Sequence, residues 1–254
     1  MTSDVRIALA LAAASSLAVA ALFPYLLATV PKLRQLTLPV RHLVLARSLN
    51  AGILMFVLAW IGLRLGAPLG LDAPMLRAWT DHESSRHGPQ SLPVAAAVGL
   101  CIGALIIVLD RWIFLASQPD ALVRGGAHFS RWKGLLAAFY GAIVEEVLSR
   151  LFLMSVIVWL GAMVLHPPSA RLFVAASLLS AVVFAVGHLP AAAQAAPLTT
   201  TAVARVIVLN TLAGFAFGIL FWRQGFEHAM VAHFSTDLVL HVVFARTTTR
   251  FGSG

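Results

Sequence analysis

Three of the ten carboxylates in this sequence of 254 residues lie inside runs of apolar residues: Glu145, Glu146 and Asp237. A charged side chain at the centre of a membrane-spanning helix costs about 2.5 to 3.5 kcal/mol, whereas each Leu or Val returns only about 0.3 to 0.6 kcal/mol. Ionisable groups at such depth usually face a cavity and mark a functional site. These residues are therefore the first candidates for proton-transfer chemistry.

Helical spacing separates the two adjacent glutamates. Glu146 and Arg150 are four residues apart and share a helix face, whereas Glu145 points about 100° away around the helix axis. Glu146 therefore has a local counter-charge. Glu145 must find a partner on another helix, stay protonated or hold a water molecule, which is typical of a general base.

Two other apolar runs supply imidazoles that could complete such a site. His188 ends one run, and His233 lies four residues before Asp237 on one face of another. Amide hydrolysis needs a base to deprotonate water, donors for the developing oxyanion and an acid for the leaving amine. A buried ion network that only fixes helix register is the alternative, but it does not require so many proton-active groups on three helices.

The composition predicts an integral membrane protein. Hydrophobic residues make up 60% of the chain, charged residues 11%, and the mean hydropathy is +0.90, whereas soluble domains carry about 25% charged residues. The net charge of +8 comes from basic residues scattered between apolar runs, so a nucleic-acid partner is not indicated. The single cysteine, Cys101, excludes an intrachain disulfide and a thiolate metal cluster.

The elements that must position these residues are transmembrane helices, and an all-α polytopic bundle of seven to eight helices is the predicted fold. A span needs about 20 apolar residues. The run from Gly134 to Leu165 exceeds this length and could break in two, which would give the eighth helix. The seven predicted runs are Val5 to Val30, Ala51 to Leu65, Pro93 to Leu109, Gly134 to Leu165, Leu172 to Val186, Val203 to Trp222 and Ala229 to Phe244.

Basic residues flank the runs unevenly and predict an orientation in the cell or inner membrane. Two connections are rich in them, and the positive-inside rule places both in the cytoplasm, with the amino terminus outside. These residues are Lys32, Arg34, Arg41 and Arg47 after the first run, and Arg111, Arg124, Arg131 and Lys133 after the third. We expect residues 1–133 to form amino-terminal helices, residues 134–246 a catalytic helical core, and residues 247–254 a short polar tail.

Three short motifs occur in order along the core. Glu145 to Arg150 reads EExxxR, Phe184 to His188 reads FxxxH, and His233 to Asp237 reads HxxxD. Their order, spacing and placement in apolar runs resemble the CPBP family of intramembrane proteases, which includes CAAX prenyl endopeptidases and bacteriocin-processing, Abi-type relatives. The resemblance covers Gly134 to Phe244, and the amino-terminal third shows only generic transmembrane helices.

The resemblance implies an intramembrane endopeptidase that hydrolyses a peptide bond of a membrane-associated protein or peptide, with or without a prenyl group. In that family the first glutamate of EExxxR and the histidine of FxxxH activate a water molecule, which here are Glu145 and His188. The last motif is implicated in stabilising the oxyanion or holding the site together, a role that passes to His233 and Asp237. The sequence does not specify the substrate.

One departure from the family concerns the last motif. Similar prenyl-processing members have asparagine where Asp237 stands, and an amide donates a hydrogen bond that an ionised carboxylate cannot. Asp237 is therefore expected to orient His233. The resemblance implies that Glu146 and Arg150 support the first motif.

Metal dependence is left open by the sequence. His233, Asp237 and His241 recur every four residues and form a face that could bind a divalent metal such as zinc, as the family's older metalloprotease label suggests. No HExxH string, which would supply two zinc ligands and a base on one helix, occurs in the chain. A G-x-S-x-G nucleophile elbow is absent too.

Two other functions are compatible with these residues. One is a non-proteolytic immunity or scaffold protein of the membrane, in which the ion network serves structure and the loops bind a partner. The other is a proton-coupled transporter, because intramembrane Glu, His and Arg also form proton relays. The sequence shows no internal repeat and no paired helix-breaking segments, which argues against a transporter.

Overall fold

A computed structural model describes residues 1–29, 39–85, 88–114, 131–165, 167–195 and 197–243 of the chain. These residues form helices and short connections without a strand, so the predicted all-α fold is confirmed. The longer α-helices are α1 (Ser3–Thr29), α2 (Val40–Gly66), α4 (Leu92–Leu109), α8 (Ala170–Gly187) and α10 (Thr200–Gln224). The shorter ones are α3 (Pro74–Asp81), α6 (Arg131–Tyr140), α7 (Ser155–Val164), α9 (Leu189–Ala195) and α11 (Phe226–Asp237).

Short 3-10 and π-helical segments extend these helices. Two 3-10 turns, η2 (Ala67–Leu69) and η3 (Pro89–Ser91), follow α2 and precede α4. Four segments are π-helical: η4 (Asp110–Phe114), η5 (Gly141–Glu145), η6 (Val147–Met154) and η7 (Leu238–Val243). η4 follows α4, η5 and η6 lie between α6 and α7, and η7 follows α11.

Six segments within the described ranges are long and apolar enough to cross a membrane, which confirms a multi-pass integral membrane protein. The predicted run from Ala229 to Phe244 is not among them. Its described part, residues 229–243, lies in α11 and η7 and is shorter than each of the six segments. The six segments are Ser3–Leu27, Val40–Leu69, Pro89–Phe114, Arg131–Val164, Ala170–Gln194 and Thr200–Gln224.

The predicted run from Gly134 to Leu165 does not break in two. It lies in α6, η5, η6 and α7, which follow one another as one long segment, Arg131–Val164. The extra helices lie elsewhere: α3 occupies part of the polar connection after α2, and α9 follows α8.

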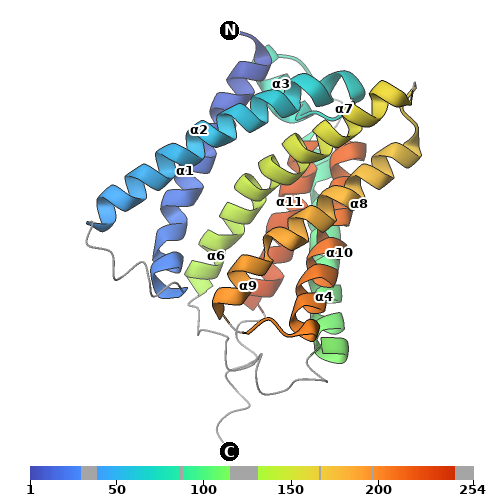
Figure 1. The fold of residues 1–254 in the computed structure, drawn as a ribbon. Coiled ribbons are helices and arrows are strands. Elements are labelled where there is room, and N and C mark those ends of the chain that lie inside the picture. Colours follow the sequence, from blue (N-terminus) through green and yellow to red (C-terminus); the bar gives the residue numbers. More distant parts are fainter. Residues whose placement is uncertain (30–38, 86–87, 115–130, 166, 196, 244–254) are drawn as a thin grey trace, which may run out of the picture.

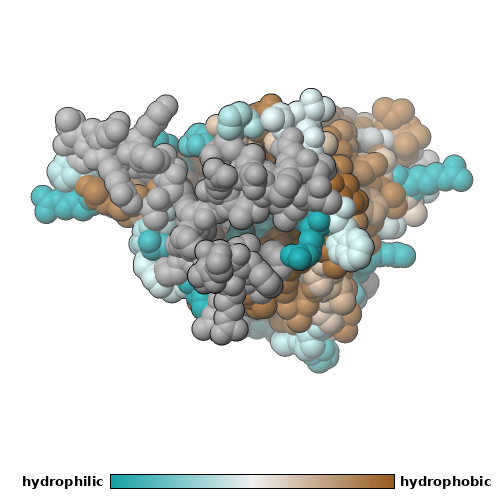
Figure 2. All heavy atoms as spheres, turned by 90° about the horizontal axis from the view of Figure 1, so that it is seen from below, coloured by the Kyte–Doolittle hydropathy of each residue, from teal (hydrophilic) through white to brown (hydrophobic). Residues whose placement is uncertain are grey.

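The helices pack in pairs around the long segment. Helix α1 packs along α2, α8 along α10, and α4 along α11 (Figure 1). The long segment contacts α1 through α6 and η5, and α2 and α8 through η6. Seen from the end where α6 begins, hydrophobic residues cover much of one flank of the bundle (Figure 2), as expected of a surface that faces lipid.

Glycines let the site-bearing helices approach one another closely. A Cβ atom added at Gly99 in α4 would lie 2.1 Å from the carbonyl oxygen of Ala232 in α11. A Cβ atom at Gly62 in α2 would lie 2.0 Å from the carbonyl oxygen of Leu151 in η6. The hydroxyl of Thr236 also donates to the carbonyl oxygen of Gly99 over 2.8 Å. These small residues therefore set how closely α11 packs on α4 and how closely the long segment packs on α2.

A polar cluster holds α3 against the end of the bundle where α11 begins. Arg77 lies 2.5 Å from Asp72 and 2.8 Å from Asp4 on α1. The carboxylate of Glu227, at the start of α11, accepts a 2.8 Å hydrogen bond from the backbone N–H of Leu76 in the first turn of α3. Burial raises the pKa of Glu227, which lies outside the six candidate spans, to about 7.

The two basic connections start from the same end of the bundle. Helix α1 ends and α2 begins at the end where η4 finishes and α6 begins, opposite the amino terminus (Figure 1). This arrangement agrees with both connections facing one side of the membrane. Lys32, Arg34 and Arg124, which contributed to the predicted orientation, and the predicted tail of residues 247–254 lie outside the described residues.

Candidate active site

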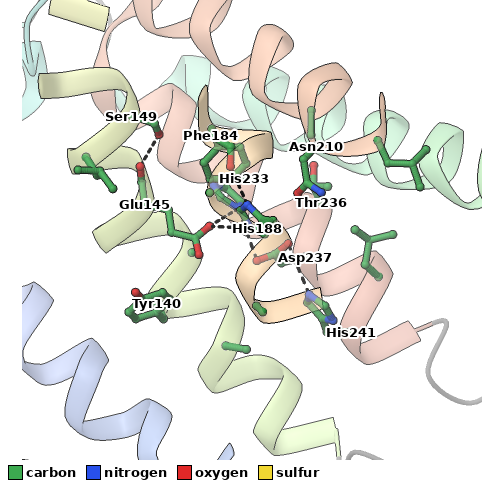
Figure 3. A pocket seen from close by; sticks show the side chains of 18 of the residues that line it. Tyr140, Glu145, Ser149, Phe184, His188, Asn210, His233, Thr236, Asp237 and His241 are labelled. Carbon is green, nitrogen blue, oxygen red and sulfur yellow. Dashed lines mark hydrogen bonds and ion pairs between the residues drawn. The ribbon is translucent and has the colours of Figure 1, made fainter. Parts of the chain in front are cut away.

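The six candidate residues named by the sequence motifs come together on three helical segments around one cavity. The cavity has a volume of about 1240 Å³ and also receives side chains from α1, α2, α4 and α10. Glu145, His188, His233 and Asp237 line it, and their side chains lie close together in Figure 3. Glu146 and Arg150 stand behind this group, and both side chains are fully buried.

Glu145 faces imidazoles from two other helices. Its Oε2 atom lies 3.9 Å from Nε2 of His188, which follows α8, and 3.8 Å from Nε2 of His233 in α11. The side chain of Glu145 is 25% exposed and that of His188 33%, whereas His233 is only 7% exposed. Glu145 and His188 can therefore be reached from the cavity, and His233 forms its inner wall.

A hydrogen bond to the last turn of α8 fixes the orientation of His188. Its Nδ1 atom lies 2.9 Å from the carbonyl oxygen of Phe184, and a carbonyl can only accept, so Nδ1 carries the proton. In the neutral ring, Nε2 then presents a lone pair toward Glu145. The aromatic ring of Phe184 also packs edge-on against the imidazole, with ring centroids 4.5 Å apart. The spacing in FxxxH thus fixes both the tautomer and the position of this imidazole.

His233 is held from the opposite side by Glu146. Its Nδ1 atom lies 2.8 Å from Oε1 of Glu146, and its ring stacks on Phe217 with centroids 4.8 Å apart. Phe184 packs perpendicular to the same ring at 6.1 Å. These contacts leave Nε2 of His233 as the ring nitrogen that faces Glu145 and the cavity.

Arg150 supplies the counter-charge that Glu146 requires. Its Nε atom lies 3.4 Å from Oε2 of Glu146, and Nη2 donates to the carbonyl oxygen of Gly214 in α10 over 2.8 Å. Nη1 donates to the hydroxyl of Ser149, and the guanidinium lies over the ring of Phe217 at 5.6 Å. A buried charge is tolerated only with such a set of partners, so this arginine ties η6 to α10.

Asp237 approaches two histidines of its own helix face. Its Oδ2 atom lies 3.6 Å from Nε2 of His233, and its Oδ1 atom lies 3.8 Å from Nε2 of His241. This placement agrees with the expected role of orienting His233. The two oxygens face different rings, so the three side chains do not converge on one point. Among the described residues, no group of three His, Cys, Asp or Glu side chains is arranged to hold a metal ion, so His233, Asp237 and His241 do not fit the zinc that the sequence left open.

Further cavity residues were not expected from the motifs. Tyr140 and Gly141 lie about one turn before Glu145, and Asn210 projects from α10 beside Thr236 (Figure 3). Asn210 had a detectable signal, because its amide interrupts the apolar run from Val203 to Trp222. Gly141 had none, since a glycine in a transmembrane helix usually serves helix packing.

Residues 127–239 match a family model described as type II CAAX prenyl endopeptidase, Rce1-like. This match supports the resemblance of the core to CPBP family intramembrane proteases. The matched segment spans somewhat less than half of the chain and contains all six candidate residues. No curated protein and no solved structure matches the chain. The family match supports a CAAX-type intramembrane endopeptidase and favours neither the transporter nor the immunity or scaffold alternative.

Proposed function

We propose that this protein hydrolyses a peptide bond of a membrane-associated substrate in the cavity, with water activated by Glu145 and His188. The observation that carries the proposal is the position of the Glu145 carboxylate, which faces two imidazole Nε2 atoms at 3.8 and 3.9 Å at the wall of a large cavity. Glu145 lacks the counter-charge in its own helix that Arg150 gives to Glu146.

The separation of Glu145 from His188 suits one shared water molecule. Two acceptors 3.9 Å apart are too far apart for a direct hydrogen bond, but each can accept from one water at about 2.8 Å. Such a water would have both protons directed at bases and a lone pair directed into the cavity. That geometry is the one a general base needs to create a nucleophile.

The reaction then needs no group beyond those present. The water oxygen attacks the scissile carbonyl carbon while its proton passes to Glu145 or His188, and the carbonyl oxygen becomes an oxyanion. His233, whose Nδ1 is bonded to Glu146, would as an imidazolium donate from Nε2 to that oxyanion. The proton taken from water returns to the leaving amine as the C–N bond breaks, which yields a carboxylic acid and an amine.

The lining of the cavity favours an apolar substrate with a polar reacting bond. Around Glu145 and His188 the wall is polar, whereas Leu22, Phe23 and Leu26 of α1 form an apolar side. Because the matched family is described by prenyl endopeptidase activity, a prenylated CAAX peptide is the first substrate to test. An unmodified transmembrane peptide is the second.

The decisive experiment replaces Glu145 with glutamine, which keeps the shape and removes the base. The purified protein is reconstituted in liposomes with a prenylated peptide that carries a fluorophore and a quencher on either side of the scissile bond. We expect E145Q to lower kcat by at least about 100-fold. The matched control is E83Q, the same change at an exposed glutamate outside the candidate spans, which should leave kcat unchanged. Cleavage by E145Q at the rate of E83Q would refute the proposed function.

A further inference from the structure

Gly141 lies one turn before Glu145 and touches the pair formed by His233 and Asp237. A Cβ atom placed on Gly141 would lie 2.8 Å from Oδ2 of Asp237 and 3.0 Å from Nε2 of His233. Both values are shorter than ordinary van der Waals contact, so one of the two side chains must move if residue 141 has a side chain. These are the two atoms that approach each other at 3.6 Å at the cavity wall.

The two side chains differ in their freedom to move. His233 is fixed by its 2.8 Å hydrogen bond to Glu146 and by its stack on Phe217. Asp237 is held by longer contacts, 3.6 Å to His233 and 3.8 Å to His241. A methyl group at position 141 would therefore displace Asp237 and leave His233 nearly in place.

Helix preference does not explain a glycine at this position. Position 141 begins the π-helical segment η5 inside a long membrane helix, and Ala is favoured over Gly in helices by about 1 kcal/mol. Gly187 in the same cavity shows that a methyl group can be accommodated nearby, since a Cβ atom there would meet nothing within 4 Å. The three atoms nearest to a Cβ atom at Gly141 all belong to Asp237 and His233.

We propose that Gly141 is a positioning residue of the active site, whose missing side chain lets the carboxylate of Asp237 approach Nε2 of His233 and stabilise the imidazolium form of that ring. This inference rests on the proposed function. It gives a role to a residue of the long segment that lies one turn before Glu145 and outside all three sequence motifs. Figure 3 shows Asp237 between the His188 and His233 group and His241.

The test is a double-mutant cycle of G141A with D237A, measured with the prenylated peptide in liposomes. We expect G141A to lower kcat about 10- to 100-fold with KM within about threefold, because small misplacements of catalytic groups cost rate rather than binding. In the D237A background, G141A should change kcat by less than about twofold, since the side chain it displaces is gone. E83Q, at an exposed glutamate that does not line the cavity, should leave kcat unchanged.

Other results would overturn the inference. A G141A variant with normal kcat would do so, and so would independent, multiplicative losses from G141A and D237A. If G141A does not fold, thermal unfolding of the double variant decides: recovery of folding in G141A/D237A supports the clash with Asp237, and its absence refutes it. E145Q separates this inference from the proposed function, because an inactive E145Q with a fully active G141A refutes the role of Gly141 alone.

Discussion

At the residue scale, the site depends on giving two adjacent glutamates opposite surroundings. Glu146 is fully buried between Arg150 and Nδ1 of His233, whereas Glu145 is 25% exposed and faces the cavity. One carboxylate is thereby committed to holding an imidazole, and the other stays available for proton transfer. Adjacent positions on a helix point about 100° apart, so a single EE pair can serve a buried network and an open cavity together.

The buried ion pair of Glu146 and Arg150 predicts the effect of removing Arg150. In R150A, the carboxylate of Glu146 loses its counter-charge within the protein interior, a change that costs about 3 to 5 kcal/mol for a buried pair. We expect a lower midpoint of thermal unfolding in detergent together with a loss of activity. R171A, at an exposed position at the start of α8, is the control and should match the unmodified protein. An R150A protein of full stability without activity would show that Arg150 acts in catalysis and not through Glu146.

At the scale of elements, the sequence predicted most of the helices but not their irregularities. Long apolar runs predicted the spans because a helix in lipid must satisfy its backbone internally. The π-helical segments around Glu145 were not predictable, since widened turns depend on tertiary contacts such as that of Gly62 with Leu151. Helix α3 was missed because eight residues in a polar connection give too weak a pattern.

For the candidate site too, the sequence named candidate residues but could not predict how their side chains are arranged. The sequence identified Glu145, His188, His233 and Asp237 because ionisable groups are costly in apolar helices. It could not show that their side chains meet, which depends on the packing of α8 and α11 against the long segment. Gly141 was beyond reach, because its importance lies in a contact with another helix.

The junction of α3 with α11 predicts a dependence of stability on pH. Burial raises the pKa of Glu227 from 4.5 to about 7, so the folded protein keeps this proton in a range where the unfolded chain has lost it. The contribution of Glu227 to the free energy of unfolding is complete below about pH 4.5 and falls as the pH rises toward about 7. E227Q mimics the protonated acid and removes the decline.

Thermal unfolding of E227Q and the unmodified protein at about pH 5 and about pH 8 tests this dependence. The advantage of E227Q over the unmodified protein should grow by on the order of 2 kcal/mol between the two conditions. E83Q, an exposed glutamate near the same end, should show the unmodified decline. A pH-independent difference between E227Q and the unmodified protein would mean that Glu227 titrates as an ordinary exposed glutamate.

At the scale of the whole molecule, the amino-terminal helices are part of the cavity. Val19 and Phe23 of α1, Arg47 of α2 and Asp110 of η4 line it together with core residues, although the family match begins only at residue 127. The candidate catalytic residues thus come from the matched core, and α1, α2 and α4 contribute to the cavity wall.

The distribution of basic residues predicts the side from which the cavity is reached. Ala191 of α9 lines the cavity, and α9 lies near the end of the bundle where α6 begins (Figure 1), which the positive-inside rule places in the cytoplasm. Single cysteines at Ala191, Trp132 and Trp79 in a C101S background report this arrangement, because Trp132 is 52% exposed at the start of α6 and Trp79 is 71% exposed on α3. A membrane-impermeant maleimide should label A191C and W132C in inverted vesicles and W79C in right-side-out vesicles. Labelling of A191C together with W79C would place the entrance on the outer side, and the proposed substrate would then have to approach from outside the cell.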